Sequence, residues 1–345
     1  MKKTTRPVTL ADIGASIGMS AKTVSRVVNR DPNVSQATRR RVEAAIAATG
    51  FRPNLAARSL AADRSFLVGC FLVNTANFYY AELVRGAARA CRRYGYHLVL
   101  EELDLQESVT DYYREHMSNI GHHGFLLAPP FCDDAALLDM LDEDGHRYVR
   151  VSPATQPGRA PSVYADDAGG VAALAEHLWQ LGHRRFGIVS GPSGHLASAV
   201  RSHSFMESLY RLGCLPSDIL SVEPDCWNPV VTGGRGAAIR MLGTGERPTA
   251  IFCYNDELAA GFIGYARDIG LSIPGDLAVA GFDDSEGARL IWPPLTTVHQ
   301  PIVEMAERAI ERLVTPQSAG DPSLMCGVEL KIRGSTDPGA MSDPA

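Results

Sequence analysis

The stretch that decides the fold of the first part of the chain is VTLADIGASIGMSAKTVSRVVN, residues 8–29. Thr9 and Asp12 have the spacing of a capping box, which predicts the start of a helix. Gly18 stands where that helix must end in a tight turn, and Ser20 can cap a second helix directly after it. Two short helices joined by a glycine turn are typical of the helix-turn-helix motif, whose second helix enters the major groove of DNA.

Apolar residues recur at helical spacing along these two helices and along a third, which Ser35 can cap and which extends to about Thr49. The positions expected to face inward are Leu10, Ile13 and Ile17, then Val24, Val27 and Val28, then Val42, Ala45 and Ile46. The outward positions of the second helix are Ala21, Lys22, Ser25, Arg26 and Asn29. The sequence therefore predicts a small three-helix head with one apolar core.

Charge is distributed unevenly along the chain. Residues 1–64 carry 12 Lys and Arg against 4 Asp and Glu, a net charge of +8, although the whole chain is at −6. The remaining residues are therefore at −14. A basic head on an acidic body indicates that the head, and not the body, binds a polyanion such as DNA.

Composition excludes several classes of protein. A chain of 345 residues exceeds one ordinary domain, and 45% hydrophobic with 21% charged residues is typical of a protein that buries a full core. The basic start lacks the apolar run of a secretory signal, and no uninterrupted run of about 18 apolar residues could span a membrane. The seven cysteines are scattered without a CxxC pair. We therefore expect a cytoplasmic protein without a disulfide framework or a zinc site.

From Ser65 onward, apolar strand patterns alternate with amphipathic helix patterns. The expected strands are 66–73, 97–101, 124–128, 148–151, 186–190, 250–253 and 277–280, and the expected helices include 79–93, 133–142, 169–181 and 256–269. Such alternation predicts parallel sheets with helices on both faces, and about 270 residues of it predict two lobes. The expected fold class is α/β, with an all-α helix-turn-helix head followed by a two-lobed core of parallel sheets.

Polar residues follow several of the expected strands. Ligands of parallel sheets bind beyond the carboxyl ends of the strands, so residues just after each strand are candidates for a binding site. The stretches that this rule singles out are 74–80, 191–192 with Arg201 on the next helix, 254–256 and 281–284. An arginine, an asparagine and a carboxylate that converge with aromatic rings suit a polyhydroxylated ligand.

These features are accompanied by a close resemblance to the LacI family of transcription regulators. In the head it rests on VTLADI (8–13), MSAKTVSRVVN (19–29), Val34, Ser35, Thr38, Val42 and GFRPN (50–54). In the core it rests on residues 166–170, 177–178, 181–185, 255–259, 273–274, GFDD at 281–284, PLTTV at 294–298 and 300–301. The resemblance covers nearly all of 65–335 and implies a core like that of the periplasmic binding proteins.

The resemblance assigns the contacts of the head with DNA. Ala21, Lys22 and Arg26 match the positions that face base edges in the major groove, where an arginine can pair bidentately with a guanine. The residues implied to contact phosphates are Thr9, Ser20, Thr23, Ser25 and Asn29. For Ser20 and Thr23, helix capping alone is an equally good interpretation.

Residues 53–64 resemble the hinge helix of the family, which becomes ordered on operator DNA. Asn54, Ala57 and Leu60 are then implied to lie at the minor groove, with Leu60 as an apolar wedge that kinks the central base step. The alternative interpretation is that Leu60 simply packs on the core.

The resemblance also assigns the effector site. The residues implied to bind the effector are Asn77, Tyr79, Arg201, Trp227, Asn255 and Asp283. Trp227 is implied to stack on a sugar ring, and an ordinary core position is its alternative. One extra residue between Trp227 and Gly233 leaves the register of that segment open.

Five positions depart from family patterns. Gly14 stands where alanine is usual, and Asp167 replaces a more usual asparagine. His195 and Ala197 stand where members that bind purines have their arginine and threonine contacts, and Asn255 replaces a glycine of those members. The differences at His195, Ala197 and Asn255 favour a saccharide effector and control of a carbohydrate-use operon, with a purine or nucleoside effector as the alternative.

The resemblance also implies the domain organisation. The expected parts are a head at 1–52, a hinge helix at 53–64, a core at 65–335 and a disordered tail at 336–345. Within the core, the N-terminal lobe is expected at about 65–165 and 298–326, and the C-terminal lobe at about 166–297 and 327–335. Because the tail lacks leucine heptads, we expect a homodimer on a pseudo-palindromic operator rather than a tetramer.

An enzyme or a transport-binding protein on the same scaffold is the competing class. Asp283 and Asp284 resemble an acid/base pair, but adjacent residues after a strand point in different directions, and nothing nominates a facing carboxyl group. His122 and His123 suit an exposed turn better than a metal site. No nucleotide-binding glycine motif occurs. We therefore expect a regulator with no catalytic residues, no metal and no cofactor.

Overall fold

The computed structural model describes residues 8–28, 31, 33–51, 59, 64–73, 77–104, 107–193, 196–225, 230–243, 247–315 and 323–340. The chain separates into two compact units, Met1–Phe66 and Leu67–Ala345. Each unit is described by itself.

The first unit contains the three predicted helices, α1 (Leu10–Ser16), α2 (Ala21–Val28) and α3 (Gln36–Thr49). The predicted capping box at α1 is present, and Ser35 caps α3 through the backbone N–H of Thr38. The core consists of four buried side chains with partly buried apolar residues around them, and it includes every predicted inward position. Gly14 has a packing reason, because a Cβ there would collide with the carbonyl of Met19.

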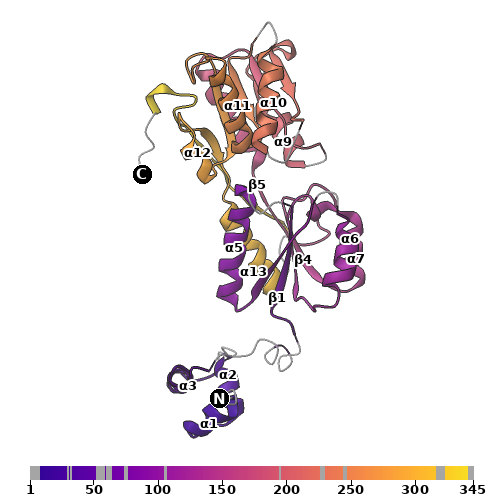
Figure 1. Cartoon of the computed structure of the whole chain (residues 1–345), viewed down its shortest axis with the longest axis vertical. Coiled ribbons are helices and arrows are strands. Elements are labelled where there is room, and N and C mark those ends of the chain that lie inside the picture. The colour runs from indigo at the N-terminus through magenta and orange to yellow at the C-terminus, as the bar shows by residue number, and fades with distance from the viewer. Residues whose placement is uncertain are drawn as a thin grey trace, which may run out of the picture. The chain divides into compact units, whose positions relative to one another are not determined.

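The first lobe of the second unit is a six-stranded parallel sheet in the order β11-β5-β4-β3-β1-β2. Its strands are β1 (Leu67–Leu72), β2 (His97–Glu102), β3 (Gly124–Leu127), β4 (Arg147–Val151), β5 (Ser162–Ala165) and β11 (Ser323–Cys326). The helices α5 (Phe78–Tyr94) and α13 (Ile302–Val314) cover one face, and α6 (Val109–Tyr112) and α7 (Ala135–Glu143) cover the other (Figure 1).

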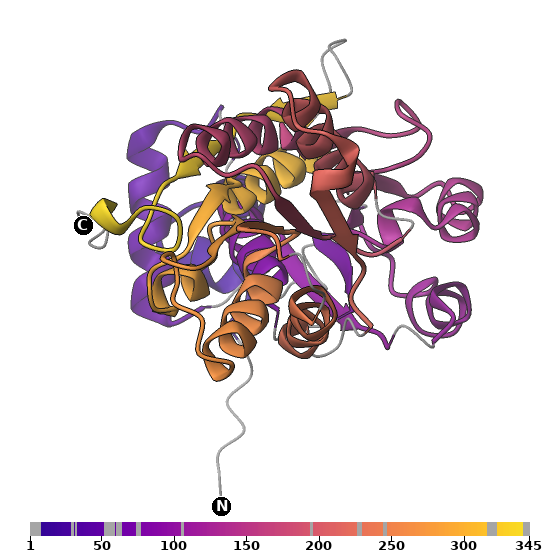
Figure 2. The ribbon, with the colours of Figure 1, turned by 90° about the horizontal axis from the view of Figure 1, so that it is seen from above.

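The second lobe has a sheet in the order β12-β10-β9-β8-β6-β7, parallel except for β12. Its strands are β6 (Phe186–Val189), β7 (Ile219–Val222), β8 (Ala250–Cys253), β9 (Ala278–Asp283), β10 (Thr296–His299) and β12 (Glu329–Lys331). Its helices are α8 (Asp167–Gln180), α9 (Leu196–Arg211), α10 (Val230–Leu242), α11 (Asp256–Asp268) and α12 (Glu286–Leu290). Figure 2 shows helices on both sides of this sheet, and a separate apolar cluster fills each side.

The chain passes between the lobes three times, after β5, after β10 and after β11. The second of these crossings follows His299, because β10 still belongs to the sheet of the second lobe. Both lobes therefore present the carboxyl ends of their parallel strands to one another, which is where a ligand is expected to bind.

Two sequence-based expectations are wrong. The tail does not become disordered at residue 336, because Thr336 is 4% exposed and its hydroxyl is hydrogen-bonded to those of Thr296 and His177 at 2.7 and 2.9 Å. Polar composition suggested disorder, but these hydroxyls have partners in the fold; residues 341–345 lie outside the described residues. His122 is buried rather than exposed, with its ring against that of Phe125.

Among the described residues, no helix combines the length and the apolar character that a membrane crossing requires. The same part of the chain contains no group of three or more His, Cys, Asp or Glu side chains arranged to hold a metal ion.

Candidate functional site

The outward face of α2 carries the residues expected to contact DNA. Ala21, Lys22 and Arg26 are exposed. The Ser20 hydroxyl accepts a hydrogen bond from the backbone N–H of Thr23 at 3.1 Å, and the two side-chain hydroxyls lie 2.9 Å apart. Both residues therefore cap the helix, and a phosphate contact by either of them stays a prediction.

Of the other predicted DNA contacts, two lie among the described residues and four do not. Thr9 donates its hydroxyl to Asp12 at 2.7 Å as part of the capping box, and Ser25 is half-buried. Four of the predicted contacts lie outside the described residues: Asn29, Asn54, Ala57 and Leu60.

Arg26 has an acidic partner within the head. Its Nε donates to Asp31 Oδ2 at 2.8 Å, and the Arg26 side chain remains 46% exposed. The Arg26 hydrogen bond is the main reason that the pKa of Asp31 is below its usual value. The guanidinium expected to bind a guanine is therefore paired with Asp31 in this structure.

The second candidate site is a cavity of about 280 Å³ between the two lobes, called here the interlobe cavity. Its lining residues are Val73, Asn77, Tyr79, Tyr80, Pro129, Pro130, Ser152, Pro192, Ala197, Arg201, Val230, Tyr254, Asn255, Asp283 and Gln300. Five of the six predicted effector residues lie on this wall. The sixth, Trp227, lies outside the described residues.

Arg201 on α9 is the charged centre of the cavity wall and is 4% exposed. Its guanidinium donates to Asp167 Oδ1 at 2.7 Å, to the carbonyl of Tyr254 at 3.0 Å and to Gln300 Oε1 at 3.2 Å. It also lies 3.6 Å from the ring centroid of Phe282. Burial alone would lower the pKa of Arg201, but the neighbouring carboxylates outweigh that effect and raise it. The arginine is thus a fixed cation that aligns groups from three parts of the chain.

Three buried polar atoms on residues of this wall have no hydrogen-bond partner: Tyr79 Oη, Asp283 Oδ1 and Gln300 Nε2. Asp283 Oδ1 lies 3.6 Å from the nearest guanidinium nitrogen of Arg201, beyond hydrogen-bonding distance. Burial raises the pKa of Asp283 and the pKa of Tyr79 well above their usual values. Since buried polar groups in native proteins almost always have partners, these atoms point to a polar ligand in the cavity.

The two asparagines of the wall have structural partners. Asn77 Oδ1 accepts from the backbone N–H of Tyr79 at 2.8 Å, and its Nδ2 donates to Glu257 of the opposite lobe at 2.5 Å. Asn255 caps α11 by accepting from the backbone N–H of Leu258 at 2.9 Å. Asn77 therefore links the two lobes at the wall of the cavity, which the sequence did not indicate.

Asp283 and Asp284 do point to different surroundings, as expected. Their φ angles are +106° and +54°, conformations that are unfavourable for residues other than glycine. Asp284 accepts from Arg333 at 2.7 Å and is hydrogen-bonded to His299 at 3.2 Å. These bonds hold the unfavourable backbone that places Asp283 on the cavity wall.

Sequence reasoning missed Gln300, Tyr254 and Ser152. Gln300 directly follows β10, so the rule about strand ends applies to it, but this four-residue strand was not among those expected. Tyr254 directly follows β8, within the stretch 254–256 that the strand-end rule indicated, but it was not among the six residues assigned to the effector. Ser152 follows β4 in the same way.

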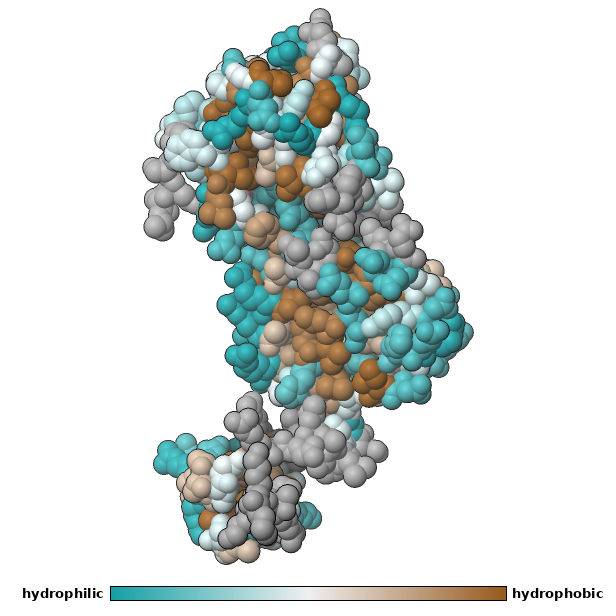
Figure 3. Space-filling model, in the orientation of Figure 1, coloured by the Kyte–Doolittle hydropathy of each residue, from teal (hydrophilic) through white to brown (hydrophobic). Residues whose placement is uncertain are grey.

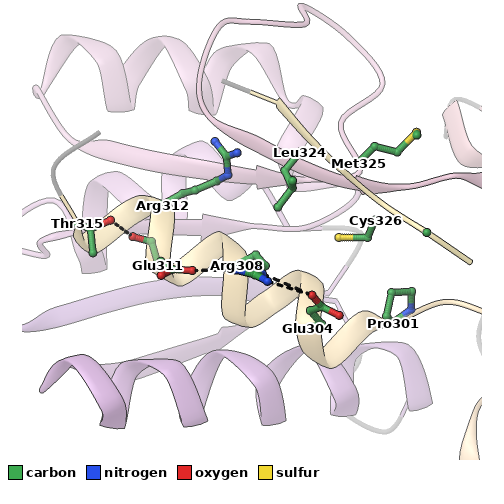
Figure 4. Close-up of a pocket in the computed structure, with 10 residues that line it drawn as sticks. Pro301, Glu304, Arg308, Glu311, Arg312, Thr315, Leu324, Met325 and Cys326 are labelled. Carbon is green, nitrogen blue, oxygen red and sulfur yellow. Dashed lines mark hydrogen bonds and ion pairs between the residues drawn. The ribbon is translucent and has the colours of Figure 1, made fainter. Parts of the chain in front are cut away.

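A larger groove of about 640 Å³ lies on the surface of the first lobe, between α13 and β11 (Figure 4). Arg308 lies 3.5 Å from Glu304 and 3.6 Å from Glu311, so these charged groups of the groove already pair with one another. None of the unpartnered buried polar atoms found in the described residues belongs to it. The interlobe cavity is therefore the stronger candidate for a ligand site.

Comparison with known families gives two matches. The family described as bacterial regulatory proteins, lacI family, matches residues 9–54. The periplasmic binding protein-like domain matches residues 175–336. The ribose operon repressor of Escherichia coli (strain K12) is 31% identical over 306 residues, which cover 89% of this chain and 92% of that protein.

Two solved structures extend the likeness to nearly the whole chain. The lac repressor dimer bound to operator and the anti-inducer ONPF has a TM-score of 0.77 at 27% identity, covering 96% of this chain and 99% of that one. The complex of the transcriptional regulator CelR with cellobiose has a TM-score of 0.68 at 28% identity, covering 96% of this chain and 100% of that one.

Proposed function

Since the chain belongs to the LacI family of bacterial regulatory proteins, we propose that it is a homodimeric repressor whose hold on its operator is controlled by a saccharide in the interlobe cavity. It is a DNA-binding regulator of transcription and not an enzyme. The genes it controls are proposed to serve carbohydrate use, and its place of action is the cytoplasm, where the operator is.

The observation that carries the saccharide proposal is the set of unpartnered polar atoms on the cavity wall. A ligand hydroxyl can donate to Asp283 Oδ1, while another can accept from Gln300 Nε2 or exchange a hydrogen bond with Tyr79 Oη. Each bond made to a buried atom of this kind removes a desolvation cost of about 1–3 kcal/mol. A ligand with several hydroxyl groups satisfies all three atoms at once.

Ring faces on the wall fit the apolar side of the same ligand. Tyr79, Tyr80 and Tyr254 line the cavity together with Pro129 and Pro130. A pyranose has polar edges and a face of C–H groups, which suits such a mixed wall. The related structure with cellobiose and the related ribose operon repressor support the saccharide class.

A homodimer is supported by an apolar edge on the first lobe. The edge strand β2 has half-buried Leu98 and Val99 and a Leu100 that is 41% exposed. Figure 3 shows hydrophobic residues gathered over the strands of this lobe, between hydrophilic helices. Apolar edge strands are usually covered, and the related lac repressor structure is a dimer on its operator. We propose that a second copy covers this edge.

For the contacts with DNA, we propose those that the resemblance to the family implies. The head, residues 1–52, reads the major groove of one half-site through Ala21, Lys22 and Arg26. The hinge, residues 53–64, places Leu60 in the minor groove. Ligand in the cavity and DNA at the heads influence one another with equal coupling free energy, so a sugar that weakens DNA binding is itself bound less tightly by the DNA complex.

The test begins with the melting temperature of the purified protein in a panel of monosaccharides, disaccharides, glycosides, purines and nucleosides. A ligand at about 100 times its dissociation constant stabilises the folded state by about 2.7 kcal/mol, which is visible as a shift. We expect a saccharide to give this shift and Asp283→Ala to abolish it. Glu176→Gln, which removes an exposed charge of the same lobe, is the control that keeps it.

Fluorescence anisotropy with operator DNA then gives the direction of control. Release of the operator on addition of the active saccharide identifies an inducer, and tighter binding identifies a corepressor. A shift in melting temperature with purines and none with sugars would refute the saccharide effector. It would not contradict the regulation of transcription by this protein.

A further inference from the structure

The N-terminal ends of two helices meet across the two lobes. The helix α5 of the first lobe begins after its N-cap Asn77, and the helix α11 of the second lobe begins after its N-cap Asn255. Both asparagines line the interlobe cavity. The free backbone N–H groups at the start of a helix carry partial positive charge, so two such ends repel one another unless an anion lies between them.

Glu257, in the first turn of α11, provides this anion. Its Oε2 accepts from Nδ2 of Asn77 at 2.5 Å, and its Oε1 accepts from the backbone N–H of Phe78 at 3.4 Å. The first turn of α5 contains no acidic residue of its own. The carboxylate at the start of this helix therefore comes from the opposite lobe, 180 residues further along the chain than Asn77. The three residues Asn77, Phe78 and Glu257 are called here the interlobe latch.

Asn77 suits this contact because its side-chain amide has both an acceptor and a donor. Its Oδ1 accepts from the backbone N–H of Tyr79 and caps α5, which leaves Nδ2 to donate to Glu257. An aspartate could cap the helix equally well, but an ionised aspartate has no hydrogen to donate to a second carboxylate. One side chain thus joins the start of a helix, the cavity wall and the opposite lobe.

The charge of Glu257 lies near the effector residues, although Glu257 does not line the cavity. Burial raises the pKa of Glu257, and the N–H of Phe78 acts against that increase. Burial is also the main cause of the raised pKa of Asp283, and the carboxyl groups of Asp256, Asp167 and Glu257 add to it. Of these three, Glu257 is the one whose hydrogen bonds, among the described residues, extend to the first lobe.

These contacts favour one arrangement of the lobes. A hydrogen bond to an ionised acceptor is stronger than one between neutral groups. If the lobes moved apart about the three segments that cross between them, both bonds of Glu257 would break together, and α5 would lose the anion at its start. The interlobe latch therefore opposes opening at a point that belongs to the cavity wall.

We propose that Glu257 holds the two lobes together by capping α5, and that it sets the fraction of the ligand-free protein in which the lobes are closed. This inference rests on the proposed control of operator binding by a ligand in the interlobe cavity. It goes beyond that proposal because it names the residue that sets the lobe arrangement before any ligand binds. Glu257 is a positioning residue, which acts on the cavity through Asn77.

The test measures the distance between the lobes in the ligand-free full chain by pulsed electron spin resonance. Spin labels are attached through an unnatural amino acid at two exposed positions, Glu143 on α7 of the first lobe and Glu207 on α9 of the second lobe. We expect one main distance in the wild type and a second, separate population in Glu257→Gln. Glu176→Gln, which removes an exposed carboxylate of the same lobe, is the matched control and should keep the wild-type distance.

A second variant acts from the other side of the interlobe latch. Asn77→Asp keeps an N-cap for α5 but places two carboxylates opposite one another. It should therefore populate the second distance at least as much as Glu257→Gln does. Melting temperatures without ligand show that the variants are folded.

The exchange of donor and acceptor is the decisive experiment. When Asn77→Asp and Glu257→Gln are combined, the glutamine amide can donate to the carboxylate at position 77, and its oxygen can accept from the N–H of Phe78. The net charge equals that of the wild type. We expect this double variant to regain the wild-type distance that each single variant loses. If Glu257 served only local stability, the two losses would add instead.

Calorimetric titration with cellobiose and ribose connects the interlobe latch to the effector site. Either sugar that binds the wild type should bind Glu257→Gln about five- to tenfold more weakly, because the ligand must then close the lobes itself. The control Glu176→Gln should keep the wild-type affinity. Failure of both sugars to bind the wild type would contradict these sugars as effectors, while the ligand-free distances still decide the role of Glu257.

Three results would overturn the inference. The first is an unchanged lobe distance in both Glu257→Gln and Asn77→Asp. The second is a double variant whose second population is as large as the sum of those in the single variants. The third is an unchanged sugar affinity in a Glu257→Gln protein whose lobes have moved apart, which would separate the interlobe latch from effector binding.

Discussion

The head and the interlobe cavity place their candidate binding residues in opposite surroundings. Lys22 and Arg26 are exposed on α2, and the core of the head is formed by other residues. In the cavity, Arg201 and Asp283 are only 4% and 8% exposed.

The difference teaches how binding and stability are coupled in each region. The charges of the head remain in water until DNA replaces that water, so they cost the folded state little. The charges of the cavity are out of water at all times, and each depends on the others for its partners. Substitutions in the head should therefore change DNA binding without changing stability. Substitutions in the cavity should change ligand binding and stability together.

The largest effect is expected for Arg201→Met. The change leaves the buried carboxylates of Asp167 and Asp283 without a cation, so the free energy of unfolding should fall by about 3–5 kcal/mol. Urea denaturation measures this loss, and adding Asp283→Asn to the variant should restore part of it. A fully stable Arg201→Met protein would contradict the view that this arginine supports the cavity.

The substitution Asp256→Asn tests how a buried charge affects stability at a residue that does not line the interlobe cavity. Asp256 is buried beside the site, accepts from Thr297 at 2.6 Å and from the N–H of Ser285 at 2.7 Å, and burial raises its pKa to about 7. Because the folded pKa lies above the unfolded value, this group makes the wild-type fold less stable as the pH rises from about 4 to about 7.

The stability of Asp256→Asn relative to the wild type should consequently increase across that interval and then level off. Urea midpoints at several pH values from 5 to 8 give the difference. A difference that does not vary with pH would show that Asp256 is already ionised at the lower end, and that its two hydrogen bonds offset the cost of burial.

Lys22→Ala tests the head. Operator affinity should fall about tenfold, and the slope of log affinity against log salt should decrease by about one if the contact is a phosphate. The free energy of unfolding should stay within about 0.5 kcal/mol of the wild type, since the side chain is exposed. The control is Lys331→Ala, which removes the same positive charge from the second unit instead of the head. A large loss of stability in Lys22→Ala would break the contrast between the two regions.

The smallest effect is expected for Asp31→Asn. Operator DNA competes with Asp31 for Arg26, so removing the carboxylate should tighten operator binding by about two- to fivefold. Glu43→Gln removes the same charge from α3 without freeing Arg26. If both variants tighten binding equally, net charge and not the ion pair is responsible.

The head was predictable from sequence almost to the residue. Its signals are local, because Thr9 and Ser35 cap helices within three residues of themselves and Val24 and Val27 lie on one face of a single helix. The βα order of the core was predictable for the same reason. The strands β5, β7 and β10 were missed because Ser, Thr or His side chains interrupt their apolar pattern. The equally short β3, β6 and β8 were predicted because they contain no polar side chain.

By itself, the sequence determined the helix-turn-helix head and the family, and through the resemblance to that family it named five residues that do lie on one cavity wall. The strand-end rule pointed to the same region, because strand ends in parallel sheets converge by topology. Only the tertiary structure decided which polar atoms remain without partners, that Asn77 holds the opposite lobe, and that Glu257 supplies the carboxylate at the start of α5. These properties depend on distances between side chains far apart in the chain, and no local pattern of residues specifies such distances.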